Sequence, residues 1–156
     1  MSAPAAAPQP LPPALDEIAQ DFEALAVPDR LQLLLDFSRE LPPLPQRYAE
    51  HPELMEPVPE CQSPIFLVTE VDGTGPDAPV SVFFSAPAEA PTTRGFAGIL
   101  AEGMSGMTAA EVVAVPTDLP ERLSLAAAVS MLRLRGMAGM LGRIQHQVRQ
   151  KAALQP

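Results

Sequence analysis

Apolar residues in most of the chain recur every three or four positions, the spacing of one buried helix face. Thr108 and Glu111 form a capping box, which predicts a short helix ending before Pro116. Residues 117–125 are expected to hold a turn or a short helix. The longer predicted helices are residues 13–25, 28–41, 92–103 and 130–151. Their expected buried positions are Leu15, Ile18, Phe22, Leu25, Leu31, Leu34, Leu35, Phe96, Ile99, Leu100, Met131, Met137, Met140, Leu141, Ile144 and Val148.

Two segments in the middle of the chain have the composition of strands. Residues 65–71 and 80–84 are rich in β-branched and aromatic residues, and Asp72-Gly73 is a turn signal between them. Because a two-stranded hairpin is only marginally stable, we expect a covering helix layer and a third strand. Met55 to Pro59 is the candidate for that strand, at the sheet edge. The predicted fold class is α+β, a small antiparallel sheet of about three strands packed against several helices.

Length and charge limit the classes of function. The chain has 156 residues and is 47% hydrophobic, enough for one domain with its own core. We expect this domain to span 13–151, after a disordered Ala/Pro tail (1–12) and before a C-terminal tail (152–156). The net charge of −9 argues against binding nucleic acid. A lone cysteine, no visible signal peptide and no apolar run of roughly 20 residues favour a cytoplasmic protein.

The lone cysteine, Cys61, lies in a proline-rich loop just before the first predicted strand. Loops on a rigid scaffold often carry functional groups, and prolines reduce the freedom of such a loop. A lone cysteine is also often just a small buried residue, so the residues alone leave both interpretations open. Glu60 beside the thiol disfavours the thiolate. We therefore expect a thiol that only a partner activates.

The remaining chemically active side chains give weaker signals. His51 and His146 are expected at the surface, and two histidines far from one cysteine do not make a metal site. Arg94 and Arg133 lie near predicted helix starts, where the helix dipole disfavours a cation. Such arginines can hold carboxylates or bind a partner, and ordinary surface salt bridges explain them equally well.

Three glycines recur every third residue in the last predicted helix, at Gly136, Gly139 and Gly142. Each costs up to about 1 kcal/mol relative to alanine inside a helix. Close packing of this helix against another backbone is the reason we expect.

Four segments occur in a recognisable order: Leu41 to Pro45, Val58 to Val68, Arg94 to Leu100 and Ser130 to Met137. Together they resemble the SufE family (SufE/CsdE-like) of sulfur acceptors for cysteine desulfurases in iron–sulfur cluster assembly. The resemblance runs from about Ile18 to Ile144. Two departures stand out: Glu60 replaces a glycine common before the cysteine, and Ala86-Pro87-Ala88-Glu89 replaces a Gly-Asp-Ser type segment.

The resemblance implies a SufE/IscU-like fold with the reactive cysteine on a loop at one edge. It implies that Cys61 takes persulfide sulfur from a pyridoxal-phosphate-dependent cysteine desulfurase (SufS-like). A cluster scaffold (SufB-like) would then receive the sulfur, and the carrier needs no cofactor of its own. Glu60, Gln62, Arg94 and Arg133 would lie near the thiol or at the partner surface.

Two other functions stay open at this point. The chain could dock on a desulfurase and activate it without carrying sulfur, or be an independent thiol enzyme or redox sensor. The absence of a neighbouring base in the sequence makes the independent enzyme the least favoured. A homodimer is also left open.

Overall fold

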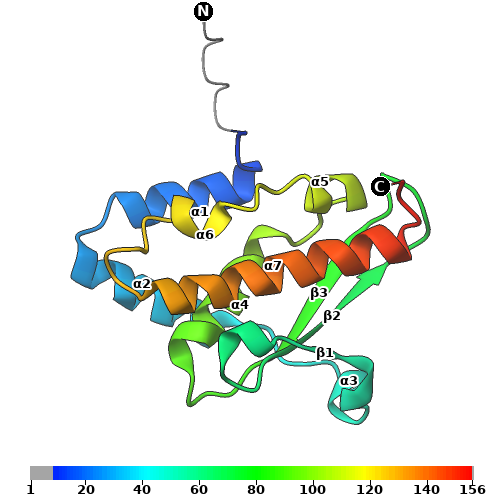
Figure 1. Cartoon of the computed structure of the whole chain (residues 1–156), viewed down its shortest axis with the longest axis horizontal. Coiled ribbons are helices and arrows are strands. Elements are labelled where there is room, and N and C mark those ends of the chain that lie inside the picture. The colour runs from blue at the N-terminus through cyan, green and yellow to red at the C-terminus, as the bar shows by residue number, and fades with distance from the viewer. Residues whose placement is uncertain (1–8, 156) are drawn as a thin grey trace, which may run out of the picture.

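The computed structural model describes residues 9–155. Three antiparallel strands form one sheet, in the order β1-β2-β3 (Figure 1). β2 (Phe66–Val71) pairs along its whole length with β3 (Val80–Ser85). β1 (Glu56–Pro57) adds a short edge on the other side of β2. The predicted α+β class, the hairpin and the third strand at the sheet edge are confirmed.

Helices precede and follow the sheet in the predicted order. Prolines begin α1, α2, α4 and α6, where the missing N–H has no intrahelical partner to lose. The capping box of Thr108 and Glu111 begins α5, and the Ser130 side chain caps α7. The short α3 within the proline-rich stretch was not predicted, because four residues carry no helical periodicity. The helices of the described residues are α1 (Pro13–Glu23), α2 (Val27–Glu40), α3 (Gln46–Ala49), α4 (Pro91–Gly103), α5 (Ala109–Val113), α6 (Leu119–Arg122) and α7 (Met131–Lys151), with 3₁₀ turns η1 (Pro52–Leu54) and η2 (Pro59–Cys61).

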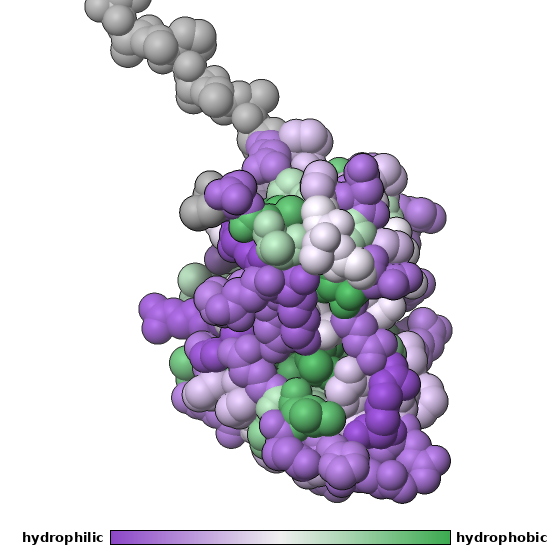
Figure 2. All heavy atoms as spheres, turned by 90° about the vertical axis from the view of Figure 1, so that its right-hand side faces the viewer, coloured by the Kyte–Doolittle hydropathy of each residue, from purple (hydrophilic) through white to green (hydrophobic). Residues whose placement is uncertain are grey.

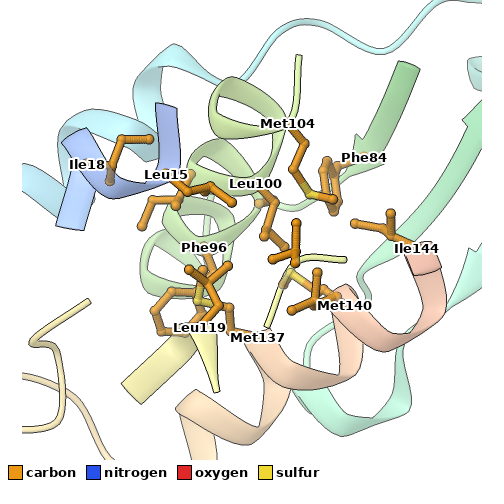
Figure 3. Close-up of a cluster of buried hydrophobic side chains, with 14 of the residues drawn as sticks. Leu15, Ile18, Phe84, Phe96, Leu100, Met104, Leu119, Met137, Met140 and Ile144 are labelled. Carbon is orange, nitrogen blue, oxygen red and sulfur yellow. The ribbon is translucent and has the colours of Figure 1, made fainter. Parts of the chain in front are cut away.

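Both faces of the sheet are covered. Leu67 and Phe84 belong to the main core, whereas Val68 and Phe83 belong to a small second cluster with Tyr48 of α3. Neighbouring strand residues point to opposite faces, which explains this division. Figure 3 shows part of the main core, where side chains of α1, α4, α6, α7 and β3 converge: Leu15, Ile18, Phe84, Phe96, Leu100, Met104, Leu119, Met137, Met140 and Ile144.

Two residues expected in the core are exposed. Leu31 is 40% exposed, because Leu34 and Phe37 make the contact of α2 with α4 instead. Met131 is 61% exposed and its neighbour Leu132 is 48% exposed, so the first turn of α7 begins outside the core. Helical periodicity predicts which face of a helix is apolar but not how far along the helix its neighbours extend.

The chain ends are more structured than expected where they are described. Most of the predicted N-terminal tail, residues 1–8, lies outside the described residues, as does residue 156. Leu11 nevertheless joins the core, and Gln9 donates a hydrogen bond of 2.8 Å to the carbonyl of Ala114. At the other end, Ala152 is fully buried and its carbonyl accepts a 2.7 Å bond from the Gly75 N–H. Apolar residues at both ends therefore extend the packed structure beyond the predicted 13–151.

The surface at the C-terminal end of α7 is largely hydrophilic, with hydrophobic residues only in small groups (Figure 2). Within residues 9–155, no helix combines the length and the hydrophobicity that crossing a membrane requires.

Candidate functional site

Cys61 is the last residue of η2, the turn between β1 and β2. Pro59 fixes the start of this turn, and the Cys61 N–H donates to the Val58 carbonyl at 3.1 Å. Gln62 then has a φ of 60°, which reverses the chain. Val58 is buried, and its N–H donates to the Ile65 carbonyl at 2.9 Å, closing the loop at its base. The proline-rich loop is therefore a defined turn held by the two strand ends, as its composition predicted.

The thiol turn, residues 58–62, packs directly on helix α7. The thiol is half-buried and donates a long hydrogen bond of 3.5 Å to the carbonyl of Gly136. A Cβ at Gly136 would lie 3.2 Å from the Cys61 sulfur, and one at Gly139 would lie 2.8 Å from a Glu60 carboxylate oxygen. The predicted close packing against another backbone is confirmed for Gly136, whereas Gly139 packs closely on the Glu60 side chain. It is wrong for Gly142, whose Cβ would meet no atom within 4 Å.

Arg143 of α7 binds two carboxylates beside the thiol. Its Nη2 and Nε donate to the two Glu60 oxygens at 2.6 and 3.2 Å, a bidentate fork. Its Nη1 donates to Glu56 at 2.6 Å. Gln147, one helical turn further along α7, donates to Glu56 at 2.8 Å and accepts from the Thr69 N–H at 2.8 Å. A continuous network thus joins the middle of β2 to the residue preceding Cys61.

The environment holds the thiol protonated. The pKa of Cys61 is raised to about 11, mainly by burial and to a lesser extent by the charge of Glu60, while Arg143 acts in the opposite direction. Hydrogen bonds from Arg143 hold the pKa of Glu60 below its usual value, so this carboxylate is charged at neutral pH. The effect of Glu60 on the thiol has the direction expected from the sequence.

A cavity of about 520 Å³ opens beside the thiol. The first turns of α4 and α7 both contribute to its wall, through Pro91 and Thr93 and through Leu132 and Arg133. Helix N-termini carry partial positive charge, so these two turns and Arg133 can attract an anion, whereas Glu60 and Glu89 place carboxylates in another part of the wall. The residues that line it are Glu60, Cys61, Gln62, Ser63, Glu89, Ala90, Pro91, Thr93, Ser130, Leu132 and Arg133.

The structure brings most, but not all, of the predicted site residues together. Glu60, Gln62 and Arg133 line the cavity with Cys61. Arg94 lines a different hollow, and it donates to the carbonyls of Ser38 at 2.9 Å and Ala86 at 2.6 Å. Arg94 therefore ties the end of α2 to the segment between β3 and α4.

Sequence reasoning missed Arg143, although a signal existed. Arg143 lies seven residues after Gly136 and four after Gly139, and Gln147 lies four residues further on, so all four share one helical face. Glu89, in the segment that departs from the SufE pattern, also lines the cavity. The available clue to Arg143 was a cationic side chain on the helix face where glycines leave room for another segment.

The two histidines lie at the surface, as expected. His51 is exposed and hydrogen-bonds to Glu53 at 2.9 Å, and His146 is exposed on α7. Among the described residues, no group of three or more His, Cys, Asp or Glu side chains could hold a metal ion.

Comparisons with known proteins agree with this fold. The chain is 54% identical over 144 residues to an uncharacterized SufE-like protein of Mycobacterium tuberculosis, covering 92% of this chain and 97% of the relative. A SufE-like protein 1, chloroplastic/mitochondrial, of Arabidopsis thaliana is 26% identical over 86% of this chain, which spans 34% of that longer protein.

A solution structure of a hypothetical protein from Thermus thermophilus superposes with a TM-score of 0.75 at 35% identity. The superposition covers 92% of this chain and 98% of that one. The family model described as SufE, Fe-S metabolism associated domain, matches residues 16–148. The chain belongs to the SufE family.

Proposed function

We propose that Cys61 accepts a sulfane sulfur atom from a cysteine desulfurase and passes it to an iron–sulfur cluster scaffold. Docking of the chain would also stimulate the desulfurase. The observation that carries the proposal is the position of the thiol, on a fixed turn beside an open cavity. Membership of a family associated with Fe–S metabolism supports the same function.

The chemistry is a thiol exchange at a sulfur–sulfur bond. The Cys61 thiolate attacks the outer sulfur of a persulfide on the desulfurase cysteine. The bond between the two donor sulfurs breaks, and the donor cysteine leaves as a thiolate. Cys61 then carries the outer sulfur as a persulfide, without any external oxidant or reductant. The pyridoxal phosphate that forms the donor persulfide belongs to the desulfurase.

The residues around the cavity have distinct proposed roles. Arg133 and the first turns of α4 and α7 would attract the anionic donor persulfide, since cations and helix N-termini stabilise negative charge. Met131 and Leu132, exposed at the start of α7, would provide apolar contact for the donor. Gln62 would shape the turn through its positive φ. Arg94 would act indirectly, by fixing the start of α4.

The raised pKa of Cys61 favours a carrier over an independent thiol enzyme. A thiol with a pKa of about 11 is almost entirely protonated at neutral pH. Attack therefore requires a change in its environment, and docking of the donor is the event that would supply it. This agrees with the expectation that only a partner activates the thiol, which is half-buried in the free protein.

Intact-mass spectrometry tests the proposal directly. The chain is mixed with a cysteine desulfurase, its pyridoxal phosphate and cysteine. We expect a gain of about one sulfur atom, lost on reduction and absent in Cys61→Ser. The His51→Ala variant, which changes an exposed loop residue, is the matched control and should gain sulfur like the wild type.

Turnover of the desulfurase in the same mixtures separates the alternatives. Stimulation that survives in Cys61→Ser, with no sulfur gained by the wild type, would replace the carrier by a docking activator. Peroxide-driven oxidation of Cys61 without any partner, and no effect on several desulfurases, would favour a redox sensor.

A further inference from the structure

Glu56, Glu60 and Arg143 form an ion-pair cluster, here called the latch, that fastens the thiol turn to α7. Arg143 bonds both carboxylates at 2.6 Å, and its fork to Glu60 uses two donors. Glu60 immediately precedes Cys61, so holding its side chain also holds the thiol.

The state that the latch holds is a poor nucleophile. The thiol faces the Gly136 carbonyl, to which it donates its proton at 3.5 Å, and it is half-buried against α7. The glycines of α7 admit the turn so closely that an added Cβ would meet Cys61 or Glu60. Attack on a donor persulfide requires the thiolate, so Cys61 must lose the proton that it donates to Gly136, and loosening of the turn would let solvent stabilise the resulting charge.

We propose that Arg143 is a positioning residue whose ion pairs keep the thiol turn closed at rest, and that sulfur uptake requires their release. Glu60 is the accessible half of the latch: its side chain is 40% exposed, against 28% for Arg143, and it lines the cavity. A cationic side chain of the docked donor, placed against Glu60, would compete with Arg143 and free the turn. This last step rests on the proposed function, whereas the latch itself does not.

Alkylation of Cys61 by iodoacetamide in the free protein tests the latch without any desulfurase. The decisive variant is Arg143→Gln, because two explanations predict opposite signs for it. If Arg143 acts only through its charge, its removal disfavours the thiolate and slows alkylation. If Arg143 closes the turn, its removal exposes the thiol and speeds alkylation, by about tenfold for the loss of a partly buried ion pair.

Matched variants isolate the latch from general effects. Arg149→Gln removes an exposed arginine from the same helix and should leave the alkylation rate unchanged. Arg143→Lys keeps the positive charge but loses the bidentate fork, so its rate of alkylation should lie between those of the wild type and Arg143→Gln. Adding Glu60→Gln should speed alkylation less in the Arg143→Gln background than in the wild type. The two substitutions open the same contact, so their effects should not add.

Hydrogen exchange distinguishes release of the turn from general unfolding. We expect faster exchange in Arg143→Gln at the amides of Cys61 and Gln62, with the amides of β2 unchanged. A rate of alkylation at or below that of the wild type would overturn the proposal, as would equal acceleration of exchange in β2. If alkylation rises as expected but no sulfur is gained from any desulfurase, the latch stands and the carrier function fails.

Discussion

Helices α4 and α7 both carry glycines that admit a neighbouring backbone, and they use this space differently. In α4, a Cβ at Gly95 or Gly98 would collide with the carbonyl groups of Leu34 and Phe37, so α2 lies directly against it. In α7, Gly136 and Gly139 admit the turn that carries Cys61. The first pair joins two long helices, whereas the second places a short turn that the latch and the two strand ends also hold.

This difference separates stability from reactivity. The contact of α2 with α4 lies within the main core, where a misfit cannot relax without moving a helix. The contact of α7 with the thiol turn lies at the edge of a cavity, where the turn can yield. Substitutions in α4 should therefore change the free energy of unfolding, and substitutions in α7 should change mainly the thiol.

Gly98→Ala should cause the largest loss of stability. Its Cβ would lie 2.8 Å from the Phe37 carbonyl carbon, so the two helices must separate. We expect a loss of roughly 3 kcal/mol, after the gain in helix propensity, and a melting temperature lower by roughly 10 °C. Thermal unfolding followed by circular dichroism measures this. The pKa of Cys61 should not change in the folded variant, and a change there would contradict the separation of the two contacts.

Alkaline pH should weaken the contact of the thiol turn with α7 and leave the contact of α2 with α4 unchanged. The pKa of Cys61 is raised from 9.0 to about 11 in the folded state, so the folded chain holds this proton more tightly. The resulting stabilisation is fully present below about pH 9 and is lost as the pH rises to about 11. Relative to Cys61→Ser, the wild type should lose up to about 2 kcal/mol over this range, measured by urea unfolding, because solvent screening of the half-buried thiol reduces the effect of the full pKa shift. A constant difference between the two proteins would show that the thiol is not shielded as described.

Gly136→Ala should change reactivity more than stability. The added Cβ lies 3.2 Å from the sulfur, so a shift of the turn by a few tenths of an ångström relieves it. The gain in helix propensity offsets the misfit, which leaves a net change within about 1 kcal/mol. We expect the pKa of Cys61 to fall from about 11 toward its ordinary value, because the displaced thiol is better solvated. The pH dependence of thiolate absorbance measures this, and an unchanged pKa together with a large loss of stability would reverse our assignment.

Most of the fold could be predicted from the sequence because its signals are local. Prolines at helix starts, the capping box at Thr108 and the hairpin turn at Asp72-Gly73 each act within a few residues. Exposure of Leu31 and Met131 could not be predicted, because it depends on where a neighbouring helix ends.

The residues of the candidate site also differ in whether their signals are local in the sequence. Cys61 and Glu60 could be identified because the loop itself contains the prolines that shape it. Arg143 was missed, since its partners Glu56 and Glu60 lie more than 80 residues away in the sequence and only its position on the glycine face of α7 pointed to it. Arg94 and Arg133 have similar positions near helix starts, yet only Arg133 lines the cavity, because the Arg94 side chain instead binds the backbone carbonyls of Ser38 and Ala86.

Gly142→Ala should have the smallest effect on stability, and it should stabilise the chain where Gly98→Ala destabilises it. This exposed glycine has the same spacing in the sequence as Gly136 and Gly139, but its Cβ would meet no atom within 4 Å. Alanine there should stabilise the chain by up to about 1 kcal/mol, through helix propensity alone, with the rate of alkylation unchanged. Urea unfolding at two protein concentrations measures this and also tests for a second copy on that face. A loss of stability that grows with protein concentration would mean that a homodimer buries Gly142, and that all three glycines admit a neighbour.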